Sequence, residues 1–165
     1  MDDERALTPV GRELARLPLD PRVGRMLLGA RSEGCLEQML VIAAALSVQD
    51  PRERPLEKQA AADQRHAKFA DERSDFLAFL KLWQVQDQPG LRRFRRENFL
   101  SVARLREWKD VHRQLRETVG ELDWKPSSAD PGKPEGFRAL HRALLAGLLG
   151  NVGMKKDEDS AYTGA

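Results

Sequence analysis

The sequence predicts an all-α fold, a bundle of about six or seven helices with no substantial sheet. Apolar residues recur at three- and four-residue spacing along most of the chain, and no run alternates apolar and polar residues at strand period. Proline and glycine separate the periodic stretches. Hydrophobic residues make up 41% and charged residues 33% of the 165, a balance that suits a folded domain better than a disordered chain or a membrane protein.

Two short helices joined by a tight turn are expected near the N-terminus. Thr8 is a candidate N-cap that is followed by proline at the first helical position, and Pro18 ends the periodic stretch behind it. Asp20 is again followed by proline, and Gly34 offers a C-terminal cap for the second helix.

The middle of the chain predicts three further helices. Residues 36–48 are apolar nearly all round and rich in alanine, which indicates a central core helix. Residues 56–70 are charge-balanced and alanine-rich, so we expect an exposed helix there. Ser74 is expected to cap the next helix, whose apolar stripe contains Trp83.

The longest helix is expected after Ser101, where a seam of mainly apolar residues at helical spacing continues for about five turns. Residues 123–136 contain three prolines and predict an irregular loop. A last helix follows from Phe137 to Leu148, and residues 154–165 are expected to be a tail. The seam consists of Leu105, Trp108, Val111, His112, Leu115, Val119 and Leu122.

Positive charge is concentrated in one segment. Residues 91–115 carry an excess of five positive charges although the net charge of the whole chain is only +2. Such clustering is typical of a surface that binds nucleic acid. Four arginines within residues 92–96 cannot all face one way on a helix, because successive residues turn by about 100°.

Farther along, basic residues recur at spacings of three and four and predict a polar ridge that could lie along a phosphate backbone. The alternative is the ordinary solvated face of an amphipathic helix, partly neutralised by Glu107 and Asp110. The basic residues of this ridge are Arg106, Lys109, Arg113 and Arg116.

Catalytic and metal chemistry find little support in the sequence. No glycine-rich P-loop is present, and His66, His112 and His141 are far apart with no metal-ligand spacing. The single cysteine, Cys35, excludes an intramolecular disulfide and is expected to be a small buried hydrophobe. Together with an acidic N-terminus that does not resemble a signal peptide, this indicates a cytoplasmic protein.

Several strings of residues resemble a known family. Leu7–Ala15 and Leu17–Leu28 resemble the stretch of DEAH-box RNA helicases in which the winged-helix domain joins the helicase-associated (HA2, ratchet-like) domain. Arg106–Trp108 suggests the bacterial HrpA-like branch. Later pieces keep the order of the family, among them Glu97–Leu100, Arg104, Asp110 and Gln114–Leu115.

The resemblance implies a domain organisation. Residues 1–18 would be the end of a winged-helix domain, residues 19–150 the ratchet-like bundle, and residues 151–165 a linker toward an OB-fold. The RecA-like motifs of the family are absent from this sequence, so the segment alone is expected to be inactive. It needs no cofactor of its own, whereas the parent helicase would use ATP and Mg²⁺.

The resemblance also implies partners and site residues. The partners would be single-stranded RNA and the RecA-like, winged-helix and OB-fold domains of the same chain, in a monomer without membrane contact. The residues expected to contact RNA are Asn98, Arg104, Arg106, Lys109 and Arg113, whereas Asp110 and Gln114 are expected to serve packing. The alternative function is a helical protein-interaction module with no direct contact to nucleic acid.

Overall fold

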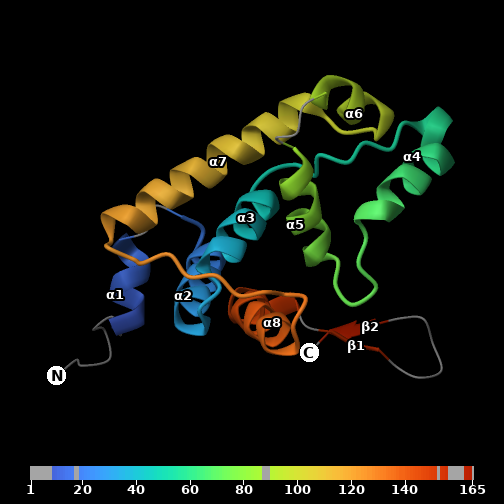
Figure 1. The fold of residues 1–165 in the computed structure, drawn as a ribbon. Coiled ribbons are helices and arrows are strands. Elements are labelled where there is room, and N and C mark those ends of the chain that lie inside the picture. The colour runs from blue at the N-terminus through green and yellow to red at the C-terminus, as the bar shows by residue number, and fades with distance from the viewer. Residues whose placement is uncertain (1–8, 17–18, 87–89, 152, 156–161, 165) are drawn as a thin grey trace. The chain divides into compact units, whose positions relative to one another are not determined.

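The computed structural model describes residues 9–16, 19–86, 90–151, 153–155 and 162–164 (Figure 1). Eight α-helices account for most of this part of the chain, which confirms the all-α class with one helix more than expected. The helices are α1 (Pro9–Arg16), α2 (Pro21–Glu33), α3 (Leu36–Leu46), α4 (Gln59–His66), α5 (Phe76–Val85), α6 (Leu91–Glu97), α7 (Val102–Glu121) and α8 (Pro134–Leu148).

A short antiparallel hairpin follows the last helix, where only a tail was expected. Its strands are β1 (Gly153–Lys155) and β2 (Tyr162–Gly164), and Met154 pairs with Thr163. Strands of three residues do not amount to a substantial sheet, so the predicted fold class stands.

The chain divides into two compact units. One consists of Met1–Met39 with Ser127–Ala165, and the other of Leu40–Pro126. Neither unit begins at residue 19, and the predicted winged-helix, ratchet and linker regions remain a prediction.

In the first unit, α2 and α8 pack side by side. Asp20 caps α2 by accepting a hydrogen bond of 2.8 Å from the backbone N–H of Arg22, and Gly34 ends it in the left-handed conformation, so both predicted caps are confirmed. The two helices approach closely at Gly147, where a Cβ would overlap the carbonyl oxygen of Arg22 and the side chain of Met26. Their buried apolar side chains include Met26, Leu27, Ala30, Leu140 and Leu144.

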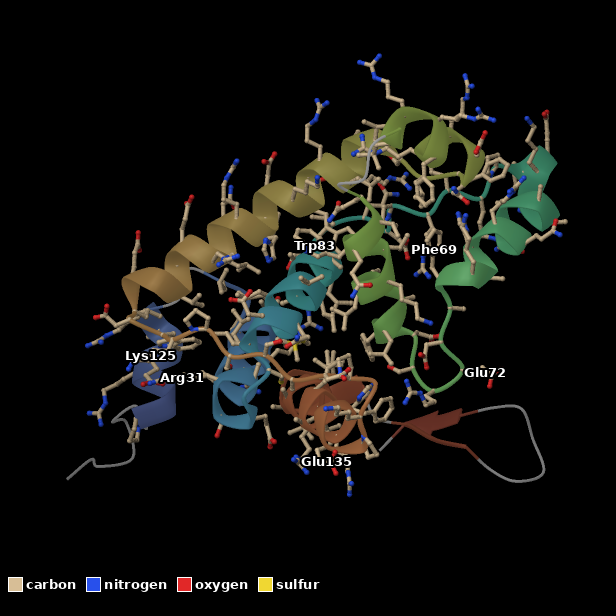
Figure 2. The ribbon with its side chains drawn as sticks, viewed as in Figure 1. Arg31, Phe69, Glu72, Trp83, Lys125 and Glu135 are labelled. Carbon is tan, nitrogen blue, oxygen red and sulfur yellow. The ribbon has the colours of Figure 1, made fainter. Side chains whose placement is uncertain are left out.

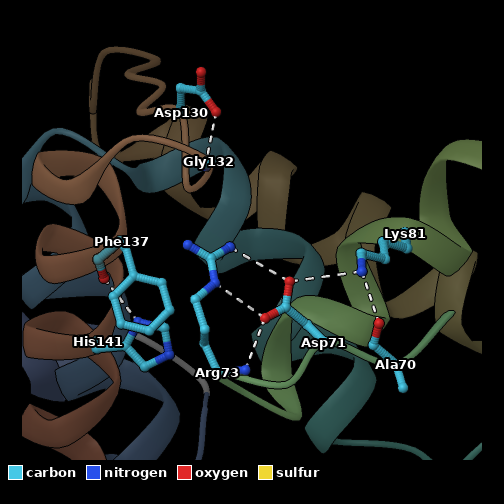
Figure 3. Close-up of polar contacts among 8 residues, drawn as sticks. All are labelled: Ala70, Asp71, Arg73, Lys81, Asp130, Gly132, Phe137 and His141. Atoms are coloured by element: carbon cyan, nitrogen blue, oxygen red, sulfur yellow. Dashed lines mark hydrogen bonds and ion pairs between the residues drawn. The ribbon is translucent and has the colours of Figure 1, made fainter.

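The start of α3 is capped by a residue distant in sequence. The hydroxyl oxygen of Ser127 accepts a hydrogen bond of 3.2 Å from the N–H of Leu36, and its carbonyl oxygen accepts one of 2.9 Å from the N–H of Glu37. These two bonds satisfy N–H groups that a helix start otherwise leaves unpaired. Figure 3 shows two other local contacts of this unit, the turn from Asp130 to Gly132 and the stacked rings of Phe137 and His141.

The second unit is organised around Trp108 of α7, which is 0% exposed. Its indole N–H donates a hydrogen bond of 2.9 Å to the carbonyl oxygen of Val41. Two aromatic side chains of α5 lie against it, with ring centroids 6.0 Å away at Phe79 and 5.0 Å away at Trp83, which is labelled in Figure 2. The predicted seam of the longest helix is therefore a core seam.

Two loops of the second unit are held by polar contacts. The segment after α3 pairs with the turn between α6 and α7, since Glu53 N–H donates to the carbonyl of Phe99 and Ser101 N–H donates to that of Pro51, both at 2.8 Å. Elsewhere, the carboxylate of Asp71 pairs with the side chains of Arg73 and Lys81 (Figure 3).

Some expected boundaries are wrong by a few residues. The helix expected over residues 56–70 is an α-helix flanked by 3₁₀ turns, η2 (Leu56–Lys58) and η3 (Ala67–Phe69). The N-cap position of α5 is Asp75 rather than Ser74. The loop expected to reach residue 136 ends at Lys133, because Pro134 takes the first helical position of α8. The signals at Thr8 and Pro18 lie outside the described residues.

Candidate nucleic-acid interface

The basic segment forms two helices with a sharp turn between them. Gly90, with a φ of 83°, precedes α6, and Asn98 follows it. The hydroxyl of Ser101 caps α7 by accepting a hydrogen bond of 3.3 Å from the N–H of Arg104, which confirms the start predicted for the longest helix. The four arginines within residues 92–96 thus lie on a separate helix, α6, which the sequence analysis did not predict.

Asn98 was expected at an RNA-facing edge, and its side chain lies in the interior of its unit. It is 2% exposed, and its Nδ2 donates a hydrogen bond of 2.7 Å to the carbonyl oxygen of Phe94. Its own carbonyl oxygen lies 2.9 Å from Nε2 of His66, which is half-buried. Asn98 therefore shapes the end of α6, because a buried polar side chain stabilises the turn that it bonds to.

Arg104 points back toward its own unit. Its side chain is half-buried, and Nη1 donates a hydrogen bond of 3.1 Å to the carbonyl oxygen of Asp50. The Asp50 carboxylate also accepts three hydrogen bonds from Arg52, two from its guanidinium group and one from its backbone N–H. Burial raises the pKa of Asp50, but these bonds outweigh burial and lower it. Arg104 thus fastens the loop after α3 to the start of α7.

The other three predicted residues follow one another along α7. Arg106 and Arg113 are exposed, whereas Lys109 is half-buried. Arg113 donates a hydrogen bond of 2.9 Å to Asp110, so part of its charge is balanced on the same helix. An exposed pair of this kind is weak and can exchange its carboxylate for another anion. These three residues form the outer ridge of α7.

His112 lies beside the ridge without adding charge to it. Its ring lies 4.4 Å from that of Trp83, between centroids. Burial, assisted by the nearby charge of Arg116, lowers the pKa of His112 to about 4, so the imidazole is neutral at pH 7. The positive charge of this face therefore comes from arginine and lysine alone.

The arginines of α6 surround a hollow in the protein surface. Its volume is about 590 Å³, and Figure 2 shows nitrogen-tipped side chains extending from α6 and the adjoining end of α7. Of the lining residues, Arg93 pairs with Glu97 at 2.6 Å, and the hydrogen bond from Arg93 lowers the pKa of Glu97. The residues that line the hollow are Arg92, Arg93, Arg95, Arg96, Val102 and Arg106.

No candidate metal site or thiolate nucleophile emerges in the described part of the chain. Groups of three or more histidine, cysteine, aspartate or glutamate residues that could hold a metal ion are absent among these residues. Cys35 is 0% exposed, as expected, and burial raises the pKa of its thiol to about 11, so it is not a thiolate nucleophile at pH 7. None of the helices described is long and apolar enough to span a bilayer.

Comparison with known proteins shows which family this sequence is similar to. Residues 20–79 match the model of the helicase associated domain (HA2), ratchet-like. The chain is 47% identical over 170 residues to an ATP-dependent RNA helicase HrpA homolog of Haemophilus influenzae and 46% identical over 174 residues to the ATP-dependent RNA helicase HrpA of Escherichia coli. Each alignment covers 99% of this chain and 13% of the relative.

The similarity extends to a eukaryotic helicase. The pre-mRNA-splicing factor ATP-dependent RNA helicase prp22 of Schizosaccharomyces pombe is 31% identical over 165 residues, which cover 98% of this chain and 14% of that protein. The chain therefore spans about a seventh or less of the length of these relatives.

Proposed function

We propose that this segment is a non-catalytic part of an ATP-dependent RNA helicase. Two findings support the proposal: residues 20–79 match the ratchet-like helicase-associated (HA2) family, and the whole chain is similar to HrpA-type helicases of the DEAH-box family. In this role it helps to enclose single-stranded RNA. It also couples the movement of ATP-driven RecA-like domains to translocation and unwinding.

The observation that carries the proposal is the outer ridge of α7. Arg106, Lys109 and Arg113 recur at spacings of three and four on a helix that Trp108 anchors in its unit. Cationic side chains on a rigid helix contact phosphates whatever the base sequence. A helicase that moves along RNA requires contacts of this sequence-independent kind.

The five residues expected to contact RNA then divide into two groups. Arg106, Lys109 and Arg113 contact the RNA backbone, because their side chains lie along the outer ridge. Arg104 and Asn98 are positioning residues, since one holds the Asp50 loop and the other holds the end of α6. Substitution of either residue affects RNA binding only by changing the shape of the turn before α7.

The surrounding machinery is proposed from the same likeness. The parent chain supplies RecA-like domains that use ATP and Mg²⁺, a winged helix that ends within residues 1–18, and an OB-fold beyond residues 151–165. Residues 19–150 act as the ratchet-like bundle, and the parent works as a cytoplasmic monomer. The segment alone neither needs a cofactor nor hydrolyses ATP.

A second candidate, a protein-interaction module, is favoured by exposed apolar side chains. Leu149 is 63% exposed and Leu56 is 89% exposed, and Leu149 lines a hollow of about 630 Å³ in the first unit together with Leu28 and Ala146. Apolar surface of this kind is typical of contacts with other protein domains.

Salt-dependent RNA binding distinguishes the two candidates. Fluorescence anisotropy with the 165-residue chain and a labelled oligouridylate should give a binding constant whose logarithm falls by about 0.7 per log unit of salt for each phosphate contacted. The variant Lys109→Glu/Arg113→Glu should bind more weakly and with a smaller slope. Salt-independent binding, or no binding at all, would contradict RNA contact and leave the interaction module as the better explanation.

A further inference from the structure

The outer ridge does not account for the hollow beside it. Arg92, Arg93, Arg95 and Arg96 belong to α6, a helix of seven residues, and the lining is completed by Val102 and Arg106 from the start of α7. Arg106 thus belongs both to the ridge and to the hollow. The two surfaces are continuous through this one side chain.

The charge in the hollow is unbalanced. Of its five arginines, Arg93 has an ion-pair partner, Glu97. Arg92, Arg95 and Arg106 form no ion pair with any residue that the structure describes, and the buried Nε of Arg95 meets no acceptor among them. Guanidinium groups keep their charge at any physiological pH, so their mutual repulsion persists until an anion enters.

The lining selects the kind of anion. Guanidinium groups bind phosphate through pairs of parallel N–H···O bonds, and several of them can share one phosphate. The described lining contains neither a carboxylate, which would repel an anion, nor an aromatic ring, on which a base could stack. The hollow is therefore suited to the backbone of a nucleic acid and not to its bases.

Resting on the proposed function, we propose that the α6–α7 arginine hollow is a seat for backbone phosphates of the single-stranded RNA that passes along α7. The RNA follows the outer ridge from Arg113 to Arg106, a rise of about 10 Å along the helix, and enters the hollow there. Arg106 holds a phosphate at the junction. Since the contact is to phosphate, its strength does not depend on base sequence.

The test compares two charge reversals of equal size in the 165-residue chain. Arg92→Glu/Arg96→Glu alters the hollow and leaves the outer ridge intact. Arg12→Glu/Arg138→Glu changes the net charge by the same amount at exposed positions of the first unit. Circular dichroism and thermal unfolding verify that both variants fold. If Arg92→Glu/Arg96→Glu does not fold, the milder variant Arg92→Gln/Arg96→Gln takes its place.

Affinity for labelled oligouridylate and oligocytidylate is measured against salt. We expect the hollow variant to bind both oligonucleotides about tenfold or more weakly, because charged hydrogen bonds to phosphate are removed. Its log–log salt slope should become shallower by about 0.7 for each phosphate that the variant no longer neutralises. The control variant should keep a slope close to that of the wild-type chain.

Four results would overturn the proposal, and the last of them leaves the proposed function standing. One is an equal loss of affinity in the hollow and control variants, which would indicate net charge alone. Another is a loss confined to one base sequence. The third is displacement of the RNA by polyglutamate as effective as by inorganic phosphate at matched charge, which would indicate a seat for an acidic protein segment. If the wild-type chain binds RNA with salt dependence while the hollow variant is unaffected, the proposed function survives and only the hollow is excluded.

Discussion

Trp108 is the side chain on which the position of α7 depends most. It is 0% exposed, donates a hydrogen bond of 2.9 Å to the carbonyl of Val41, and contacts the rings of Phe79 and Trp83. Trp108→Ala removes these interactions together and leaves a cavity under the middle of the helix. We expect the second unit to lose much of its stability.

The size of the effect follows from these interactions. Replacement of a buried tryptophan by alanine costs about 3–5 kcal/mol, which combines the transfer free energy of the removed atoms with the cavity that remains. The indole hydrogen bond, worth about 1 kcal/mol, places Trp108→Ala in the upper half of that range. At about 2–4 °C per kcal/mol for a chain of this length, the melting temperature should fall by about 10 °C or more. Trp108→Phe retains a ring and should be less destabilised.

Urea unfolding followed by far-ultraviolet circular dichroism measures the free energy of unfolding of each variant. Leu56→Ala is the control, because Leu56 is 89% exposed and its truncation should change that free energy by less than about 0.5 kcal/mol. A decrease below about 1 kcal/mol in Trp108→Ala would refute the argument that α7 is anchored by this side chain.

Three further outcomes are expected. Gly147→Ala should destabilise the chain by about 1–3 kcal/mol in thermal unfolding, because the added Cβ overlaps Arg22 and Met26. Gly120→Ala in α7 is the control and should be neutral or slightly stabilising, because no atom lies within 4 Å of its added Cβ. Equal effects of the two substitutions would contradict the close approach of α2 and α8 at Gly147. The pKa of His112 in the folded chain is about 4, below its ordinary 6.5, so the unfolded chain binds the extra proton and stability should fall as pH drops from 6.5 toward 4. His112→Gln should remove that part of the pH dependence in urea unfolding, and an unchanged profile would exclude His112 as its source. Cys35 should react with a thiol reagent at pH 8 far more slowly in the folded than in the urea-unfolded chain, and equal rates would contradict its burial.

Local signals in the sequence predict much of the fold. Asp20 and Gly34 bound α2 as expected, and Ser101 caps α7, because the hydrogen bonds of such caps form within a few residues of the chain. The seam through Trp108 was also predicted, since helical spacing alone brings its members to one face. These features depend on neighbours in sequence and not on the tertiary fold.

Features that depend on distant partners were not predicted. Ser127 caps α3 from 91 residues away, and no local pattern marks that contact. Asn98 was assigned to an exposed edge, but its side chain lies in the interior and donates a hydrogen bond to the carbonyl oxygen of Phe94. The helix α6 was missed because four arginines within five residues conceal its apolar face, although Gly90 before it marks its start.

Photocrosslinking of single-stranded RNA that contains 4-thiouridine tests most directly whether the α6–α7 face contacts the nucleic acid. The 165-residue chain is saturated with this RNA, irradiated and digested, and the crosslinked peptides are identified by mass spectrometry. We expect the crosslinks to concentrate in residues 91–116 and to decrease as salt rises, because the contacts that hold the RNA there are ionic. Crosslinks that instead concentrate on α2 or α8, at a salt concentration where RNA remains bound, would contradict the account.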